Sequence, residues 1–135
     1  MATAGYSGTR QLAKLGIRPG VGWDVIGADD GWRFEEQPVA ADRTDADADV
    51  VLAFARDLAA VAAVISGNER RVFPAGALWV AWPRKAAGHV SDVTENAIRD
   101  AALPRGLVDV KVAAVDHDWS ALKLVWRREL RPGVR

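Results

Sequence analysis

Two hydrophobic patterns occur along the chain, and each predicts a different kind of strand. Residues 50–55 and 77–82 are continuous apolar runs, which are typical of strands covered on both faces of a parallel sheet. Residues 107–115 and 121–128 instead alternate apolar with charged positions, which predicts half-buried strands. Because a polar turn at residues 116–120 joins them, we expect these two strands to pair antiparallel.

Helical spacing of apolar residues predicts three helices, and a short apolar segment predicts a further strand. The helices are expected at residues 9–15, 56–71 and 91–103, and the strand at residues 23–27. Gly16 is expected to end the first helix. Ser91 or Asp92 is expected to cap the third helix, which Pro104 stops. The polar segment at residues 35–49, where aspartates recur among alanines, is interpreted as a solvated loop.

The order of these elements predicts an α/β fold, with a Rossmann-like, mostly parallel open sheet that ends in an antiparallel hairpin. Right-handed crossovers that progress in one direction would place the helices mainly on one face of this sheet. The length of 135 residues suits a single domain. Its N-terminal helix, first strand and loop would occupy residues 1–48, and its core residues 49–135.

The opposite face of such a sheet would have a thin cover. Only the short N-terminal helix and the segment around Trp32 and Phe34 remain to shield it. Exposed apolar patches larger than a few hundred square ångströms usually mark a partner surface. We therefore expect a homodimer that buries part of this face or of its N-terminal cover.

Composition narrows the classes of function. The 18 basic residues balance the 18 acidic ones, so the basic excess of nucleic-acid-binding domains is missing and no nucleic-acid partner is expected. The chain has no cysteine, which excludes disulfides, thiolate catalysis and thiolate metal sites. Its longest apolar run, residues 58–65, is too short to span a membrane, and the N-terminus lacks a signal-peptide core. We therefore expect no membrane partner and a cytoplasmic location.

Polar and aromatic residues follow the predicted strands at the edge where parallel strands end, and ligands collect at such an edge. The candidate ligand-binding residues are Asp29, Asp30, Trp32, Arg56, Arg84, Lys85, His89, Asp116, His117 and Trp119. Arg84 and Lys85 are adjacent cations, so a small anionic ligand is the expected partner. The alternative is that these are the polar residues any set of loops carries.

His117 is the one candidate considered for catalysis. Asp116 and Asp118 flank it, so it could act as a general base beside an orienting carboxylate, or it could be a solvated turn residue. A metal held by His117, Asp116 and His89 would require two loops to converge, and their spacing gives no sign of this. No metal site is expected.

Several motifs carry a resemblance to known proteins. They are YSGT at residues 6–9, KLGI at 14–17, ALWVAWP at 77–83, GLVDVKV at 106–112 and WS at 119–120. Together they resemble a small bacterial family of unknown function with a truncated methyltransferase-like Rossmann fold. The resemblance implies a final strand inserted antiparallel beside its neighbours, and it carries no established activity.

The chain departs from a working methyltransferase at the cofactor turn. Gly27 and Gly31 remain, but Val25 stands at the position of the acidic residue and Asp29 at that of the middle glycine. We therefore expect no cofactor and no binding of S-adenosylmethionine. The predicted function is a non-catalytic binding or regulatory module. The alternative is a small enzyme, either a transferase with an unusual cofactor pose or an acid–base enzyme that uses His117.

Overall fold

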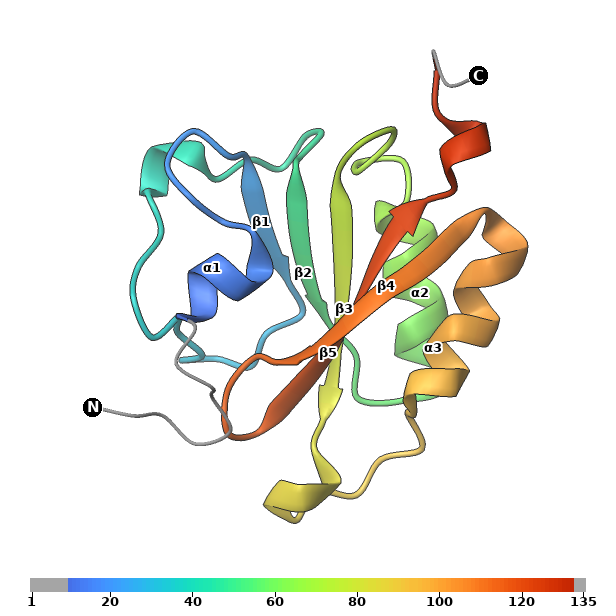
Figure 1. Cartoon of the computed structure of the whole chain (residues 1–135). Helices are drawn as coiled ribbons and strands as arrows, with labels where there is room; N and C mark the ends of the chain where they lie inside the picture. The colour runs from blue at the N-terminus through green and yellow to red at the C-terminus, as the bar shows by residue number, and fades with distance from the viewer. Residues whose placement is uncertain (1–9, 133–135) are drawn as a thin grey trace.

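The computed structural model describes residues 10–132, and its centre is one five-stranded sheet (Figure 1). The elements are α1 (Gln11–Leu15), β1 (Trp23–Ile26), η1 (Ala40–Asp42), β2 (Val50–Phe54), α2 (Leu58–Asn68), β3 (Ala77–Pro83), η2 (Lys85–Ala87), α3 (Glu95–Ala102), η3 (Leu103–Arg105), β4 (Leu107–Ala114), β5 (Trp119–Trp126) and η4 (Arg128–Leu130). The YSGT motif and the expected first helical residue, Thr9, lie outside the described residues.

The sheet is mixed, so the prediction of a mostly parallel, Rossmann-like sheet is wrong. The strand order is β1-β2-β3-β5-β4, in which β1, β2 and β3 pair parallel while β5 pairs antiparallel with both β3 and β4. The antiparallel strands β4 and β5 are also the longest, with eight residues each. Moreover, β1 and β2 are joined by a loop whose regular part is η1, where a Rossmann fold would have a crossover helix. The described chain is therefore mostly β, with few helices.

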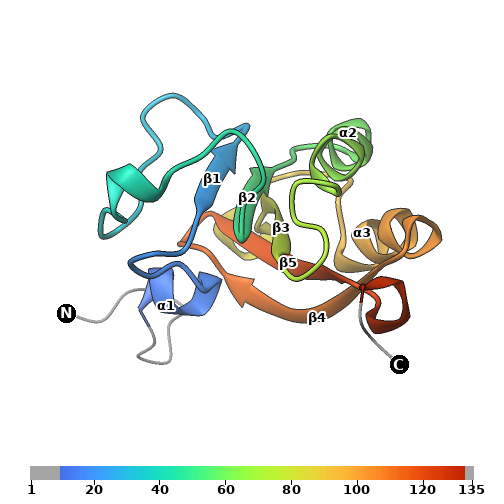
Figure 2. The same cartoon turned by 90° about the horizontal axis from the view of Figure 1, so that it is seen from above.

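The helices lie on both sides of the sheet, and each side has its own apolar core (Figure 2). On one side, α2 and α3 supply Val61, Ile65 and Ile98 to a core that also includes Trp126 of β5. On the other side, Leu15 of α1 and the loop after β1 pack against β2 and β3. The sheet is thus covered on both faces over its parallel strands.

Hydrogen bonds fix the N-terminal segment to this second face. The buried indole of Trp79 donates from Nε1 to the carbonyl oxygen of Leu15 at 3.1 Å. Gln11, which is 2% exposed, donates from Nε2 to the carbonyl of Val115 at 2.7 Å and accepts the backbone N–H of Glu35 at 2.9 Å. The apolar patch expected over β2 and β3 is therefore covered, and the homodimer inferred from it stays a prediction.

The starts of α3 and β5 differ from the prediction because local hydrogen bonds decide them. Helix α3 begins at Glu95, since the Thr94 hydroxyl accepts the N–H of Ala97 at 3.0 Å and so supplies the N-cap. Strand β5 begins at Trp119, within the expected turn, because Val115 donates its N–H to the Trp119 carbonyl at 2.8 Å. The turn of the hairpin is therefore tighter than its polar sequence predicts.

Candidate functional site

The predicted residues at the strand ends are partly brought together, and their first group lies between β1, β2 and β5. Asp29 in the loop after β1 forms an ion pair with Arg56 after β2. The Arg56 guanidinium lies 4.8 Å from the ring centre of Trp119, which is 5% exposed. Asp30 is exposed beside this group. Asp29 and Arg56 thus neutralise each other, which removes the free positive charge that an anion would need.

A second group holds the hairpin turn in shape. Asp116 accepts the backbone N–H groups of Asp118 and Trp119 on Oδ1, at 2.9 and 3.0 Å. Its other oxygen accepts the indole Nε1–H of Trp32 at 3.0 Å. Arg84 donates from Nη1 to the carbonyl of His117 at 2.9 Å. Asp116 and Arg84 are therefore used by the turn itself.

The two histidines occupy different environments. His89 Nε2 lies 2.9 Å from Asp118 Oδ1, and this hydrogen bond holds the pKa of the Asp118 carboxyl below its usual range. The His117 side chain is exposed, and both carboxylates beside it in sequence have other partners. Among the described residues, the His117 side chain therefore makes no hydrogen bond with either flanking carboxylate, and the arrangement needed for a general base is not formed.

Arg84 and Lys85 border a shallow cavity of about 280 Å³ on the α3 side of the sheet. Thr94 and Glu95 at the start of α3 line its other wall, together with Ser120 of β5. Of the two cations, Lys85 is exposed, whereas Arg84 is half-buried against the hairpin turn. The predicted residues therefore form two groups that share Trp119, and they do not line one common pocket.

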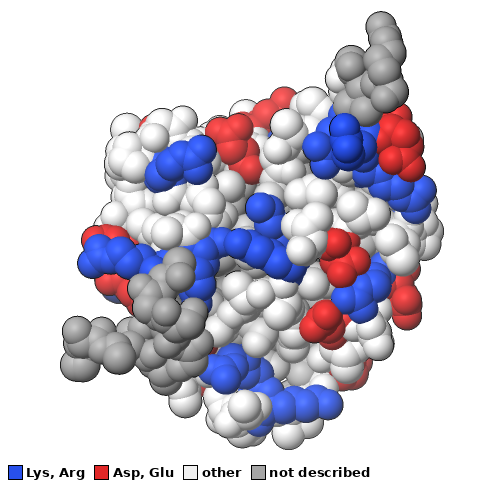
Figure 3. Space-filling model, in the orientation of Figure 1, with Lys and Arg blue, Asp and Glu red and all other residues white. Residues whose placement is uncertain are grey.

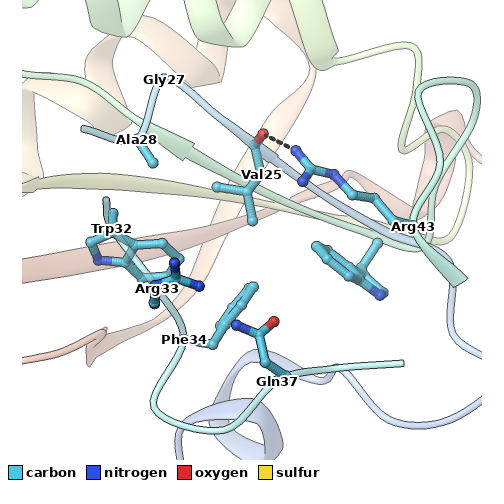
Figure 4. A pocket seen from close by; sticks show the side chains of 9 residues that line it. Val25, Gly27, Ala28, Trp32, Arg33, Phe34, Gln37 and Arg43 are labelled. Carbon is cyan, nitrogen blue, oxygen red and sulfur yellow. Dashed lines mark hydrogen bonds between the residues drawn. The ribbon is translucent and has the colours of Figure 1, made fainter. Parts of the chain in front are cut away.

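A larger pocket lies outside the edge strand β1. Of the candidate ligand-binding residues only Trp32 lines it, together with Val25 and Gly27 of the cofactor turn. It has a volume of about 360 Å³ and is lined by Trp23, Val25, Gly27, Ala28, Trp32, Arg33, Phe34, Gln37 and Arg43. We call it the β1 pocket. Figure 4 shows Trp32 and Arg33 at one end and Arg43 at the other, with Phe34 and Gln37 below Val25. Strand β1 and the loop that follows it thus supply most of its lining.

The aromatic wall of the β1 pocket belongs to a continuous series of edge-to-face contacts. Phe34 lies with its ring centre 5.6 Å from that of Trp23 and 4.9 Å from that of Trp32. Trp32 continues the series to Phe54 at 5.0 Å, and Phe54 to Trp119 at 4.7 Å. Such contacts hold the rings in fixed orientations. These contacts therefore fix the orientation of the aromatic side chains that line the pocket.

Arg43 is held at the rim of the pocket by a buried carboxylate. Its Nε atom lies 3.0 Å from Oδ1 of Asp24, which is only 5% exposed, and its Nη2 atom donates to the carbonyl of Val25 at 3.2 Å. Arg71 approaches Asp24 from the other side, with Nη2 2.9 Å from Oδ2. Two arginines thus face one carboxylate. Among the described residues, Nη1 of Arg43 has no hydrogen-bond partner.

Arg33 supplies a second cation at the opposite end of the pocket. Its side chain is exposed and makes no ion pair with any residue in the range 10–132. The exposed side chain of Gln37 adds an amide that can donate or accept. The β1 pocket therefore combines two guanidinium groups, one amide and three aromatic side chains. This combination suits a flat molecule that carries a negative charge.

The fold places the chain among small proteins built on a mixed β-sheet. More particularly, it belongs to the family DUF3052, described as a protein of unknown function, which matches residues 33–128. Membership in a family of unknown function is thereby confirmed. No curated protein matches the chain. The matched region contains both arginines of the β1 pocket but begins after β1, Gly27 and Trp32.

Within the described part of the chain, no three histidine, aspartate or glutamate side chains are grouped so that they could hold a metal ion. No helix there has the length and apolar character needed to cross a membrane.

Proposed function

We propose that this protein is a non-catalytic binding module whose β1 pocket takes a small aromatic anion, such as a ring that bears a carboxylate or a phosphate. The observation that carries the proposal is Arg33, a cation without an ion-pair partner among the described residues, at the end of an aromatic pocket. A volume of about 360 Å³ suits a small molecule of this kind.

The arrangement of the two arginines supports an anion in particular. The guanidinium of Arg43 is fixed by Asp24 and Val25, so it can offer Nη1 without losing further side-chain entropy. Arg33 can fold over the ring of a bound ligand from the other end. A charge-assisted hydrogen bond contributes roughly 1.5 to 3 kcal/mol, and stacking against the aromatic wall adds to it.

Binding is better supported than catalysis. An acid–base enzyme would need His117 beside a free carboxylate, but Asp116 and Asp118 are engaged by the turn, Trp32 and His89. The anion site expected at Arg84 and Lys85 remains a second candidate, because these cations border their own cavity. One set of variants separates the two sites.

A thermal-shift titration tests the proposal. The probes are benzoate, adenosine monophosphate, inorganic phosphate and S-adenosylmethionine. A ligand at a hundred times its Kd adds about 2.7 kcal/mol to the free energy of unfolding, which raises the melting temperature measurably. We expect the aromatic anions to raise it more than phosphate does, and S-adenosylmethionine to leave it unchanged.

Two variants locate the site. Arg33→Ala should abolish the shift caused by the aromatic anions, whereas Lys85→Ala, which removes an equal charge from the other cavity, should keep it. If the melting-temperature shift is lost in Lys85→Ala and retained in Arg33→Ala, the ligand binds beside Arg84 and Lys85. If no aromatic anion shifts the wild-type protein, the proposal is wrong.

A further inference from the structure

One face of the sheet is left without a helix, on the side of β4 and β5 that faces away from α2 and α3. Helix α1 lies on this side over the parallel strands (Figure 2). It reaches β4 at the last residue of that strand, where Lys14 Nζ donates to the carbonyl oxygen of Ala114 at 2.7 Å. The β4–β5 register places Val108 opposite Val125 and Lys111 opposite Lys123. We call these four residues the lysine face. It is distinct from the β1 pocket, which lies at the other edge of the sheet.

The two lysines meet across the strands directly above a buried tryptophan. The Nζ atoms of Lys111 and Lys123 each lie 5.9 Å from the ring centre of Trp79. Burial, and then the charge of Lys111, lower the pKa of the Lys123 ammonium. Like charges directly opposite each other on neighbouring strands destabilise a sheet. The pair therefore costs the fold some stability.

Nothing in the described part of the chain neutralises this pair. Neither Lys111 nor Lys123 forms an ion pair with a residue in the range 10–132. Figure 3 shows lysine and arginine side chains gathered in a band across the middle of the face seen in Figure 1, with uncharged surface on both sides of the band. Val108 and Val125 of the lysine face therefore lie beside a concentration of positive charge.

A hollow continues the lysine face at its upper end. It has a volume of about 440 Å³ and runs from Lys123 and Val125 to the strand-entry segments at Gly16 and Gly76. Arg18 and Asp49 also line it, and Asp49 already accepts the backbone N–H of Gly22 at 2.9 Å. Apolar side chains of a partner could enter this hollow while its acidic side chains remain over the lysines.

We propose that the lysine face docks an acidic segment of a partner protein. Carboxylates of the partner would lie between Lys111 and Lys123, and its apolar side chains would pack on Val108 and Val125. Charge complementarity carries this choice, because an incoming carboxylate relieves the repulsion between the two ammonium groups. A second copy of the chain fits poorly, since a two-fold contact through this face would bring four lysines together.

Fluorescence anisotropy with a labelled acidic peptide tests the proposal. The probe is a peptide of repeated Glu-Glu-Leu-Leu units, and the comparison probes are a single-stranded DNA of equal charge and vesicles of phosphatidylserine. We expect the wild-type protein to bind the peptide more tightly than the DNA or the vesicles. A protein concentration of about 1 mM would detect a complex with a Kd as weak as about 1 mM. If the peptide does not bind at that concentration, the proposal is wrong. Tighter binding to DNA or to vesicles would also overturn it.

Paired variants of equal charge assign the surface. The double variant Lys111→Gln/Lys123→Gln should bind the peptide at least tenfold more weakly than the wild type. Its melting temperature should equal or exceed that of the wild type, because the repulsion between the two ammonium groups is removed. Lys85→Gln with Arg128→Gln removes the same charge from exposed positions elsewhere and should bind as the wild type does. Equal weakening in both pairs would show a general effect of net charge and would contradict the proposed face. In the backbone amide spectrum, the peptide should shift residues 108–111 and 123–125.

Discussion

Asp24 explains why a short edge strand can support a pocket. Its carboxylate is buried in β1 but is paired with both Arg43 and Arg71. Arg71 also donates to the carbonyls of Thr44 and Ala46, at 3.0 and 2.8 Å, so the same network ties the loop before β2 to the sheet. A buried charge with complete hydrogen bonding is tolerated, whereas its loss leaves the partner charges unsatisfied. The rim of the β1 pocket thus depends on one side chain.

Replacing Asp24 should therefore destabilise the protein strongly. Breaking a buried ion pair by removing one partner costs about 3 kcal/mol or more, and Asp24→Ala leaves Arg71, whose side chain is 16% exposed, without its carboxylate. Urea denaturation measures the change in the free energy of unfolding. Glu36→Ala is the control, because its pair with Arg10 is exposed and should change stability by less than about 0.5 kcal/mol. Equal effects of the two variants would contradict this account of Asp24.

Asp109 gives a prediction about pH. Its hydrogen bond from Arg99, at 2.9 Å, lowers the pKa of the carboxyl below the ordinary value of 3.8. Between the lowered and the ordinary pKa the unfolded chain binds more protons, so this contribution to stability is complete above pH 3.8 and is lost as the pH falls through the folded pKa. Asp109→Asn should be less stable than the wild type at neutral pH, and the difference should shrink in acid.

Denaturant unfolding at several pH values measures this difference. Arg99→Gln removes the donor and should reproduce the loss at neutral pH and its disappearance in acid. A stability difference between Asp109→Asn and the wild type that stays constant from neutral pH to below 3.8 would contradict the assignment to this ion pair.

At the scale of single residues, the sequence predicted the polar residues that meet at the strand ends better than it predicted the β1 pocket. Polar residues after strands were expected to cluster, and several of them do meet, as Arg56 with Asp29 and His89 with Asp118 show. Their mutual pairing could not be foreseen, because it depends on side-chain directions across loops. Arg33 was missed for the same reason. The sequence shows an arginine in a polar loop, but it does not show that Trp32 and Phe34 line a pocket beside it.

At the scale of elements, the entry into β3 depends on a close backbone approach. A Cβ atom at Gly76 would lie 2.8 Å from the carbonyl oxygen of Asp49, 2.9 Å from that of Ala48 and 3.0 Å from that of Val72. These are backbone atoms of two neighbouring segments, so they cannot move aside as a flexible side chain would. Glycine is therefore required where β3 enters the sheet beside β2.

Gly76→Ala should destabilise the protein by about 1 to 3 kcal/mol, the usual cost of forcing an extra group into a packed region. Gly67→Ala is the matched control, because Gly67 lies in α2 with no atom within 4 Å of the added Cβ. That variant should gain roughly 0.5 to 1 kcal/mol from helix propensity. Thermal or urea unfolding of both variants decides the point, and a loss of stability in Gly67→Ala or none in Gly76→Ala would contradict it.

The elements themselves were predicted well wherever burial alone defines them. The continuous apolar runs became β2 and β3, which are buried along nearly their whole length. Trp79 and Trp82 point to opposite faces of β3, as their spacing requires, and pack into different cores. The start of α3 was misplaced because three polar residues compete as caps there. Ser91 donates to the Arg56 carbonyl and Asp92 accepts the N–H of Leu58, whereas Thr94 caps the helix.

At the scale of the whole molecule, the pairing of strands could not be deduced from their order along the chain. The hydrophobic pattern gave β4 and β5 as a hairpin, but it does not say which of the two lies beside β3. Insertion of β5 between β3 and β4 makes two of the four strand pairings antiparallel and moves β4 to the edge. Long-range contacts of this kind depend on the complete sheet, which is why the mostly parallel prediction failed.

The two edges of the sheet lead to the last prediction, which concerns the homodimer. The β1 edge is closed, because Thr44 donates its N–H to the Trp23 carbonyl and Arg43 binds the Val25 carbonyl. The β4 edge instead carries Val110 and Val112, which are 52% and 49% exposed. An exposed apolar edge strand is a template for pairing with another chain. If the chain dimerises, β4 is therefore the expected contact, and not the covered face over β2 and β3.

Light scattering coupled to size-exclusion chromatography measures the mass. We expect twice 14.5 kDa for the wild type at high protein concentration. Val112→Lys should return the protein to a monomer, because it removes one of the two exposed valines of β4 and adds a second lysine next to Lys111. Val39→Lys is the control, since Val39 is similarly exposed, at 45%, but lies in the loop before η1. A wild-type mass of 14.5 kDa at every concentration would show that the β4 edge stays unpaired in solution.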